Sequence, residues 1–227
     1  MITIERKKNV MMEHKIYSNT QIVDVSYSSR FLYESGKLNP FYPHKKIPIP
    51  FTHGYDGISV SSIWNSLKVF EDSDVNMALR NSTNIQDLKR ENLGRTIGFR
   101  QGYFNNNIMT VAEARRKIFI PMYRWTLEQK AFPIIQILRE IVQQRDIVLL
   151  DDSVNCDINN INQPLSHAWL TKSYIEGSYP FENIYEHIIE YHIGPKDRRW
   201  TTTKKVLKEI KPDNISSQFD IEFDYDC

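Results

Sequence analysis

Apolar residues recur at spacings of three and four between Val60 and Phe70, and this spacing is typical of an amphipathic helix. Ser59 directly precedes the run and is a suitable N-cap, because its hydroxyl can accept a hydrogen bond from a free backbone N–H of the first turn. A polar strip lies beside the apolar stripe and consists of Ser61, Asn65 and Lys68. The pattern therefore predicts a core helix whose polar edge includes Lys68.

A second helix is expected to begin at Thr110, because Thr110 and Glu113 have the spacing of a capping box. We expect Pro121 to kink or end this helix, since proline lacks the backbone N–H that a helix interior needs. The remaining helical patterns cover residues 74–80, 84–92, 126–145, 164–172, 181–193 and 204–211.

Two segments have the pattern of β-strands. Residues 22–27 alternate between apolar and polar side chains, and residues 146–151 are a short apolar run between acids, as in a buried strand. Residues 38–51 contain four prolines, which exclude a helix or a central strand, so this segment should be an ordered extended loop. Residues 1–20 are polar and basic and are expected to form a frayed or edge segment.

Together these patterns predict an α+β fold that is mostly helical and contains a few short strands. The chain of 227 residues is long enough for one large domain or two small ones, and 41% of its residues are hydrophobic, so it can bury a substantial core. We find no internal repeat and no segment with the composition of a linker. A single domain over residues 1–227 is therefore expected.

The charge balance argues against general electrostatic binding. The chain has 29 basic and 28 acidic residues, whereas a general binder of nucleic acid or membrane surfaces normally has a clear basic excess. A local basic groove is still compatible with this balance. The two cysteines and six histidines lack zinc-site spacing, and we see no signal peptide or membrane-spanning run. We expect a cytoplasmic protein that needs no metal or cofactor and does not bind membranes.

Three groups of residues could together bind and cleave a phosphorylated nucleoside. Phosphate binding needs fixed cations, and the candidates are Lys68, Arg95, Arg100, Arg115 and Arg116. Nucleobases stack on aromatic rings, and the candidates are Trp64, Tyr103, Tyr123 and Trp125. Cleavage of a glycosidic bond needs a carboxylate beside the anomeric carbon, and the candidates after the predicted buried strand are Asp151, Asp152 and Asp157. Each group also has a structural interpretation, in which arginines pair with surface acids, aromatics fill the core and aspartates close a turn.

Other kinds of site lack their sequence signatures. The chain contains no GxSxG elbow, no P-loop and no GxGxxG motif. Cys156 and His167 could form a thiol nucleophile and its base, but nothing in the loop around Cys156 indicates a lowered thiol pKa. We therefore set a cysteine nucleophile aside.

The order of these segments resembles the NADAR superfamily, whose members process ADP-ribose and related N-glycosides. A typical member has a Thr-Ser-Glu-His-Tyr-Phe-Gln helix that ends in Lys-Phe, then a Gly-Arg pair, a helix rich in Arg and Phe, and a strand that leads into an Asp/Asn-rich loop. The corresponding segments here are SVSSIWNSLKVFE, Gly94-Arg95, AEARRKIF and IVLLDD. The similarity covers residues 15–170 and leaves residues 171–227 as a helical C-terminal extension with an acidic tail.

The resemblance implies roles for individual residues. Lys68 matches the helix lysine of the family and would contact the ribose or phosphate as a catalytic residue. A loop aspartate would be the acid or base, and the candidates are Asp151, Asp152 and Asp157. The residues expected to contact the substrate are Ser61, Trp64, Arg95, Arg100, Arg115 and Asn155. The family has a catalytic glutamate seven residues before its lysine, and Ser61 stands in that place; the late Trp-Gly element of the family is also missing.

The function that the resemblance implies is an N-glycoside hydrolase acting on an ADP-ribosyl or phosphoribosyl substrate, such as ADP-ribosylated guanine in DNA or nucleotides. Because serine cannot replace a catalytic carboxylate, a second interpretation is an inactive protein that binds ADP-ribose or a nucleotide. A third is an interaction protein without a small-molecule pocket. Stabilisation by a ligand without product would indicate the second, and no response to any nucleotide would indicate the third.

Overall fold

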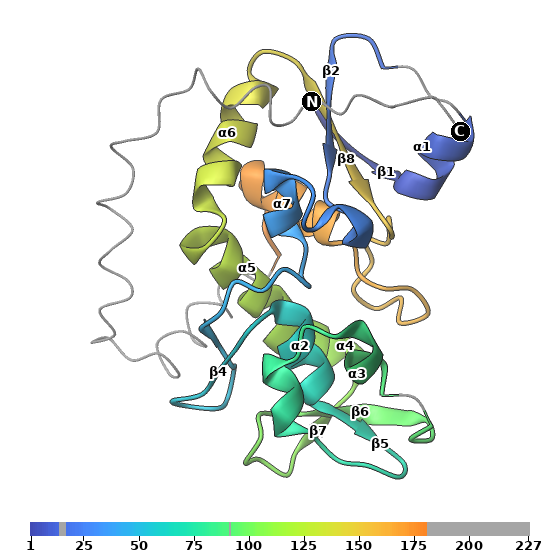
Figure 1. Ribbon diagram of the computed structural model, residues 1–227, viewed down its shortest axis with the longest axis vertical. Helices are drawn as coiled ribbons and strands as arrows, with labels where there is room; N and C mark the ends of the chain where they lie inside the picture. The colour runs from blue at the N-terminus through green and yellow to red at the C-terminus, as the bar shows by residue number, and fades with distance from the viewer. Residues whose placement is uncertain (14–16, 91, 181–227) are drawn as a thin grey trace.

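The computed structural model describes residues 1–13, 17–90 and 92–180 (Figure 1). The predicted helices at residues 181–193 and 204–211, and the acidic tail, lie outside the described residues. Within the described part, helices combine with small sheets, so the predicted α+β fold is confirmed. None of the described helices is long and apolar enough to cross a membrane.

A three-stranded parallel sheet forms one end of the molecule (Figure 1). Its central strand is β8 (Asp146–Asp151), which lies between β1 (Ile2–Arg6) and β2 (Thr20–Asp24). Every residue of β8 after the first is buried, which confirms the predicted buried strand. Residues 1–20 contain an edge strand, as expected, and the chain continues from it into α1 (Lys7–Glu13).

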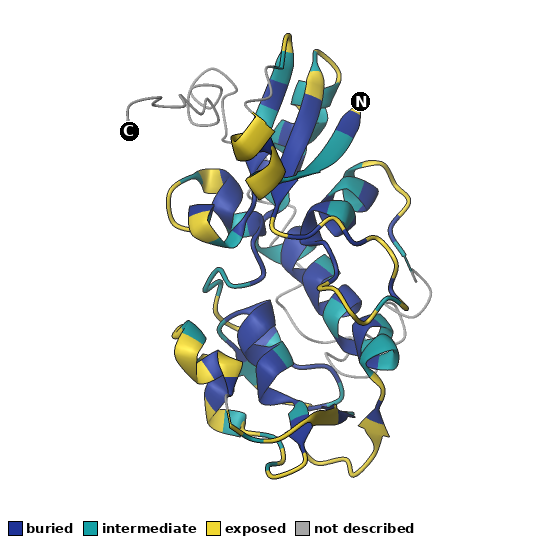
Figure 2. Ribbon diagram, turned by 90° about the vertical axis from the view of Figure 1, so that its right-hand side faces the viewer, coloured by how far each residue is buried: buried dark blue, intermediate teal, exposed yellow. Residues whose placement is uncertain are grey.

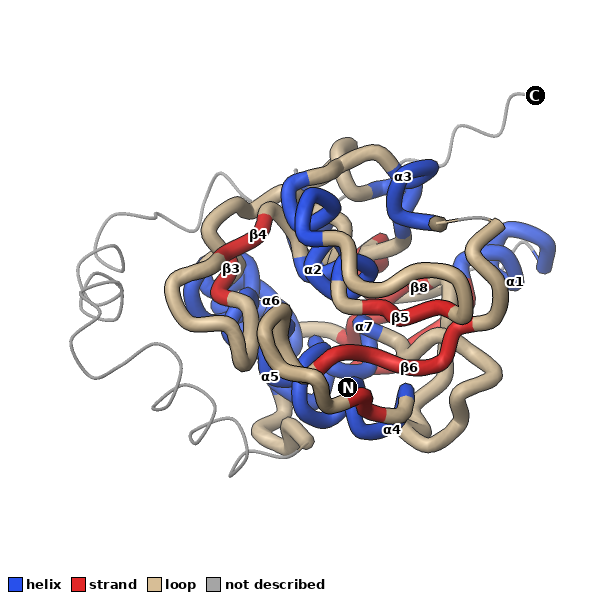
Figure 3. The backbone as a smooth tube through the Cα atoms, turned by 90° about the horizontal axis from the view of Figure 1, so that it is seen from below, coloured by secondary structure: helices blue, strands red, loops and turns tan. Residues whose placement is uncertain are grey.

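A three-stranded antiparallel sheet lies at the opposite end of the molecule (Figure 1). It consists of β5 (Lys68–Phe70), β6 (Thr96–Arg100) and β7 (Ile108–Met109) in that order. Figure 3 shows β5 and β6 side by side at this end. The proline-rich segment contributes only the two-residue strand β3 (Ile47–Pro48), which pairs with β4 (Asp56–Gly57).

The helix α2 (Val60–Ser66) begins as the sequence predicts. Ser59 Oγ accepts a hydrogen bond from the backbone N of Ser62 at 3.0 Å, and Ser62 Oγ accepts one from the backbone N of Ser59, which completes a capping box. The prediction that Lys68 lies on this helix is wrong, because the helix ends at Ser66 and Lys68 is the first residue of β5. Pairing of β5 with β6 holds the backbone of Lys68 in an extended conformation.

One continuous helical segment runs through the middle of the molecule. Its hydrogen-bond pattern changes from α-helical to π-helical and back to α-helical. It consists of α4 (Val111–Ala114), a π-helical turn (Arg115–Phe119) and α5 (Ile120–Gln129). The predicted capping box of Thr110 and Glu113 opens it, but the predicted break at Pro121 is wrong. The N–H of Ile120 donates to Arg115 O across the π-helical turn, and Pro121 follows in the first turn of α5, where a missing N–H costs little.

The helix predicted at residues 126–145 is divided in two. α5 ends at Gln129, and α6 (Phe132–Val142) starts after Ala131 with Pro133 in its first turn. Pro133 has no N–H to donate to the carbonyl of Gln129, so the helix cannot continue across this point. The shorter predicted helices are displaced: a 3₁₀ helix with Asn76 as its N-cap covers Met77–Asn81, and the others are α3 (Ile85–Lys89) and α7 (His167–Ile175).

The core lies between the two sheets, and Figure 2 shows that the helices there are largely buried. Tyr123 on α5 is 1% exposed, and its hydroxyl donates to Leu38 O at 2.6 Å and lies 2.8 Å from Thr171 Oγ1. This contact joins the proline-rich segment and α7 to α5. The central helix thereby positions segments that are far apart in the sequence.

Candidate functional site

The parallel sheet brings the carboxyl ends of β2 and β8 to the same edge, and polar residues follow both strands. Ser26 and Tyr27 come after β2, whereas Asp152 and Ser153 come after β8. Ligands of parallel sheets commonly bind beyond the carboxyl ends of the strands. A cavity of about 380 Å³ lies at this edge, and small-molecule sites typically occupy ~300–1,000 Å³.

The wall of the cavity comes from both ends of the molecule. The residues after β2 and β8 and the first residue of α7 form one side, and α2 and the π-helical turn form the other. Six of the polar and aromatic candidates that the sequence predicts for the site line the cavity: Ser61, Trp64, Lys68, Arg115, Asp151 and Asp152. Arg95, Arg100, Arg116, Asn155 and Asp157 do not line it.

The polar edge of α2 faces the cavity with two buried side chains. Ser61 is 5% exposed and Asn65 is 8% exposed. The Asn65 amide nitrogen donates to the carbonyl oxygen of Ser61 at 2.8 Å. Neither the Ser61 hydroxyl nor Asn65 Oδ1 has a hydrogen-bond partner among the described residues. Two oxygens are therefore left to contact a bound molecule.

Lys68 lines the cavity just beyond α2 and is partly buried. Burial lowers the pKa of its ammonium, and the charge of nearby Arg90 lowers it further. The Arg90 guanidinium donates to the backbone oxygen of Lys68 at 2.8 Å. No carboxylate or other acceptor in the described part of the chain contacts Lys68 Nζ. This arrangement suits an anionic ligand, which would supply the missing countercharge.

Aromatic rings supply apolar surface on two sides of the cavity. The indole of Trp64 packs on Phe99 with ring centroids 3.9 Å apart, and the ring of Phe119 meets it edge-on at 5.5 Å. Tyr27 lies on the opposite side, where its ring meets Phe41 edge-on at 4.9 Å. Because packing restrains Trp64 and Tyr27, they can bind a flat ring without much further loss of side-chain freedom.

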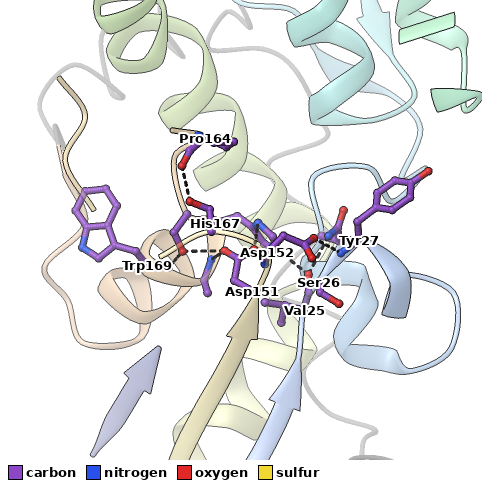
Figure 4. A network of polar contacts seen from close by, with 12 residues as sticks. Val25, Ser26, Tyr27, Asp151, Asp152, Pro164, His167 and Trp169 are labelled. Atoms are coloured by element: carbon purple, nitrogen blue, oxygen red, sulfur yellow. Dashed lines mark hydrogen bonds and ion pairs between the residues drawn. The ribbon is translucent and has the colours of Figure 1, made fainter. Parts of the chain in front are cut away.

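Asp151 is buried and serves to join β8 to α7 (Figure 4). Its Oδ2 accepts hydrogen bonds from Ser166 Oγ at 2.8 Å and from the backbone N of Ala168 at 3.1 Å. Its Oδ1 accepts from the backbone N of Asp152 at 2.7 Å and lies 3.3 Å from His167 Nδ1. Both oxygens are occupied, so Asp151 is poorly placed to activate water.

His167 lines the cavity, but both of its ring nitrogens are engaged (Figure 4). Nε2 lies 2.7 Å from the carbonyl oxygen of Val25, which can only accept, so Nε2 carries a proton. Nδ1 faces Asp151. The histidine therefore connects the ends of β2 and β8 and offers no free nitrogen for proton transfer.

Asp152 differs from its neighbour, because it lines the cavity and is exposed. Its Oδ2 accepts a hydrogen bond from the backbone N of Tyr27 at 2.8 Å (Figure 4). Oδ1 has no partner among the described residues. Asp152 is consequently the best-placed carboxylate for chemistry in this cavity.

Arg115 holds the loop that follows β8. Its guanidinium donates to the carbonyl oxygens of Ile158, Asn160 and Gln163 at 2.9, 2.8 and 2.6 Å. Burial lowers the pKa of the Arg115 guanidinium, and the charge of Asp157 acts in the opposite direction. Because three of its five N–H donors bond to the loop, Arg115 positions the cavity wall.

Asn155 and Asp157 close turns within the same loop. The Asn155 amide donates to the carbonyl oxygens of Asn160 and Gln163 at 3.1 and 3.2 Å, and its Oδ1 accepts from the backbone N of Asp157. Asp157 Oδ1 in turn accepts from the backbone N of Asn159 at 2.9 Å. Asn155 and Asp157 are therefore turn-forming residues. Closing a turn is the alternative role that the sequence analysis gives for the loop aspartates.

Arg95 and Arg100 pair with acids on the antiparallel sheet. Arg95 Nε lies 3.3 Å from Glu71, and the Arg95 side chain is 83% exposed. Arg100 forms two hydrogen bonds to the Asp74 carboxylate, at 3.0 and 2.5 Å, and these lower the pKa of Asp74. The other aromatic candidates, Tyr103, Tyr123 and Trp125, belong to the hydrophobic core.

The thiol of Cys156 shows no sign of activation. Desolvation raises its pKa, and Sγ contacts the carbonyl oxygen of Val154. In the described ranges, no group of three or more His, Cys, Asp or Glu residues is arranged to hold a metal ion.

The chain belongs to a family of unknown function, DUF6939, which matches residues 5–171. The matched range includes every residue that lines the cavity. No curated protein matches the chain.

Proposed function

We propose that the protein is an N-glycoside hydrolase that acts on a phosphoribosyl compound. The observation that carries this proposal is the ammonium of Lys68, which has no partner among the described residues and lines the same cavity as the Asp152 carboxylate. An uncompensated, partly buried cation favours an anionic ligand. A carboxylate with a free oxygen is the group that hydrolysis of a glycosidic bond requires.

The aromatic walls support a ligand that combines a phosphate with a flat ring. Trp64 and the face of Tyr27 that the Arg30 guanidinium does not cover offer surfaces on which a nucleobase or similar leaving group could stack. Lys68 would bind the phosphate. The resemblance of the α2 region, the Gly94-Arg95 pair and the Arg/Phe-rich helix to the NADAR superfamily supports an N-glycosidic rather than an O-glycosidic bond.

The available positive charge favours one phosphate over two. Of the described lining residues, Lys68 alone has a cationic group without a hydrogen bond inside the protein, because the Arg115 guanidinium makes three bonds to the loop. Arg95 and Arg100 pair with acids outside the cavity. A phosphoribosyl ligand therefore fits this charge better than the diphosphate of an ADP-ribosyl group.

In the proposed reaction, water attacks the anomeric carbon while the bond to the base nitrogen breaks. The electron pair of that bond leaves with the base nitrogen, and the water oxygen forms the new bond to carbon. Asp152 steadies the positive charge that develops on the sugar and takes the proton that the water loses; that proton then passes to the base nitrogen, so the neutral base leaves and the carboxylate is restored. The hydrogen bond from the Tyr27 backbone holds one oxygen of Asp152, so the other can face the water.

The test is a product assay on a panel of N-glycosides. The purified protein would be incubated with nucleoside 5′-monophosphates, phosphoribosylamine compounds, ADP-ribose and ADP-ribosylated guanosine, and products would be read by mass spectrometry. The proposal expects free base and ribose 5-phosphate from at least one phosphoribosyl compound. Release of ADP-ribose alone would move the assignment to ADP-ribosyl substrates, and no product from any compound would contradict hydrolysis.

A second candidate function is binding without turnover. Ser61 favours it, because a serine stands where the resemblance would place a catalytic glutamate. Of the two aspartates that line the cavity, only Asp152 has a free oxygen. A thermal shift with phosphorylated ligands and no product would indicate this binding function.

A further inference from the structure

Asn65 has a fixed orientation in the cavity wall. Its amide nitrogen donates to the carbonyl oxygen of Ser61 at 2.8 Å, and a carbonyl oxygen can only accept. The amide nitrogen must therefore point to the helix backbone, which leaves Oδ1 as the group without a partner among the described residues. Asn65 lines the cavity and is 8% exposed. It thus offers a bound molecule an acceptor whose direction is already set.

Oδ1 is not itself a fully buried atom, but a ligand that covers it must offer a hydrogen-bond donor, because an acceptor cut off from water without a hydrogen bond is costly. The ligand group that suits it is a donor such as a hydroxyl. Asn65 lies three residues before Lys68, and both side chains line the cavity. In a sugar 5-phosphate the ring hydroxyls are joined to the phosphate by a short carbon chain, so one molecule can meet both side chains.

We propose that Asn65 is a specificity-determining residue that accepts a hydrogen bond from a ring hydroxyl of the sugar phosphate, so that the site selects ribosyl over deoxyribosyl ligands. The inference rests on the proposed function, because Lys68 must hold the phosphate for the sugar to lie beside Asn65. Asn65 would distinguish ribosyl from deoxyribosyl phosphates, which carry the same charge. Lys68 cannot make this distinction, because it recognises only the charge. A site built to bond a hydroxyl rejects the analogue that lacks it, since its own polar group is then left unpaired.

Binding of three non-hydrolysable probes tests this assignment. The probes are ribose 5-phosphate and its 2-deoxy and 3-deoxy forms, titrated by calorimetry into the wild-type protein and the Asn65→Leu variant. Leucine has a similar size but no acceptor. We expect the wild-type protein to bind ribose 5-phosphate at least ~5-fold more tightly than one of the deoxy forms. Asn65→Leu should bind all three about equally.

Two further variants keep the test decisive. Asn65→Asp retains an oxygen at this position, so it should keep the preference for ribose even if all affinities fall from charge repulsion. Asn106→Leu changes an exposed asparagine away from the cavity and should behave as the wild-type protein does. If Asn65→Leu fails to fold, the wild-type and Asn65→Asp titrations carry the test.

The possible results separate this inference from the proposed function. Equal binding of all three probes to the wild-type protein would overturn the role of Asn65 and leave the phosphoribosyl site standing. A preference for ribose that persists in Asn65→Leu would also overturn it. Binding of none of the probes would overturn both.

Discussion

The backbone N of Asp152 donates to Oδ1 of Asp151 at 2.7 Å, and the two adjacent carboxylates face different partners. Asp151 is 1% exposed and accepts hydrogen bonds from Ser166 and Ala168, so it joins β8 to the start of α7. Asp152 lines the cavity and keeps one oxygen free. One carboxylate therefore supports the fold, and the other is available for chemistry.

Substitution of Asp151 should mainly reduce stability. Asp151→Ala would leave the Ser166 hydroxyl and the backbone N–H of Ala168 without an acceptor in a buried place, so we expect a loss of at least about 3 kcal/mol in the free energy of unfolding. Asp152→Ala is the matched control and should cost less than about 1 kcal/mol, since it removes one exposed hydrogen bond. Urea denaturation of the two variants measures the difference, and equal losses would contradict it.

Substitution of Asp152 should mainly reduce turnover. Asp152→Asn keeps an oxygen for the Tyr27 backbone but cannot take a proton, so we expect kcat to fall at least ~100-fold while thermal stability is retained. Asp157→Asn changes a loop aspartate that does not line the cavity and should leave kcat nearly unchanged. The opposite ranking of the two variants would show that Asp157 is the reacting carboxylate.

Ligand affinity should depend on pH through Lys68. Burial lowers the pKa of this ammonium, so the positive charge is present below the lowered pKa and is lost as pH rises through it. We expect the affinity for ribose 5-phosphate to fall as pH rises, and to do so at lower pH than an ordinary lysine, with a pKa of ~10.4, would allow. Lys68→Arg keeps its charge throughout this range, so it should bind with little pH dependence. Calorimetric titrations at several pH values provide the check, and a flat wild-type profile would count against the assignment.

Stability at mildly acidic pH should depend on His44. Burial lowers its pKa from 6.5 to about 4, although the carbonyl of Lys37, 2.7 Å from Nε2, acts in the opposite direction. Between these values the unfolded chain binds a proton that the folded protein does not, so stability is complete above pH 6.5 and falls as pH decreases toward 4. The contribution is at most ~3 kcal/mol.

A His44→Gln variant isolates this contribution. Its amide can still donate to the Lys37 carbonyl but does not titrate. The variant should lose less stability than the wild-type protein between pH 6.5 and pH 4, as measured by chemical denaturation at each pH. Identical pH dependence in the two proteins would show that His44 is not responsible.

The loop after β8 should loosen when Arg115 is shortened. Arg115→Lys keeps the charge but cannot donate to the three carbonyl oxygens that the guanidinium reaches, so we expect a loss of roughly 2–4 kcal/mol. Amide hydrogen exchange at residues 155–163 should become faster. Arg116→Lys, which alters the neighbouring contact to Asn159, is the control and should leave exchange in this loop close to that of the wild-type protein.

Local signals in the sequence were sufficient for the start of α2 and for the buried strand β8. The Ser59 cap and the apolar run at residues 146–151 depend on residues that are close in the sequence. The start of α2 and the strand β8 could therefore be predicted from the sequence alone. The end of α2 could not be predicted in this way, because it depends on pairing between β5 and β6, which are distant in the chain. The continuity of the helix through Pro121 depended on a π-helical turn that no residue pattern marks.

The sequence predicted several residues that line the cavity, but not how they are brought together. Trp64 and Lys68 were identified from α2 and its continuation, and both line the cavity. The sequence could not distinguish Asp151 from Asp152, because the choice depends on α7 docking against β8. Tyr27 was missed as well. Its one available signal is its position after a strand, which matters only once that strand is known to lie beside β8.

The most direct test of the account compares turnover of a phosphoribosyl N-glycoside by the wild-type protein, Lys68→Ala and Lys8→Ala. Lys8 is an exposed lysine on α1 and serves as the matched control. Ribose 5-phosphate should be released by the wild-type protein and by Lys8→Ala, but not by Lys68→Ala. Equal release by all three proteins would contradict the role of Lys68, and no release by the wild-type protein across the panel would contradict the proposed hydrolysis.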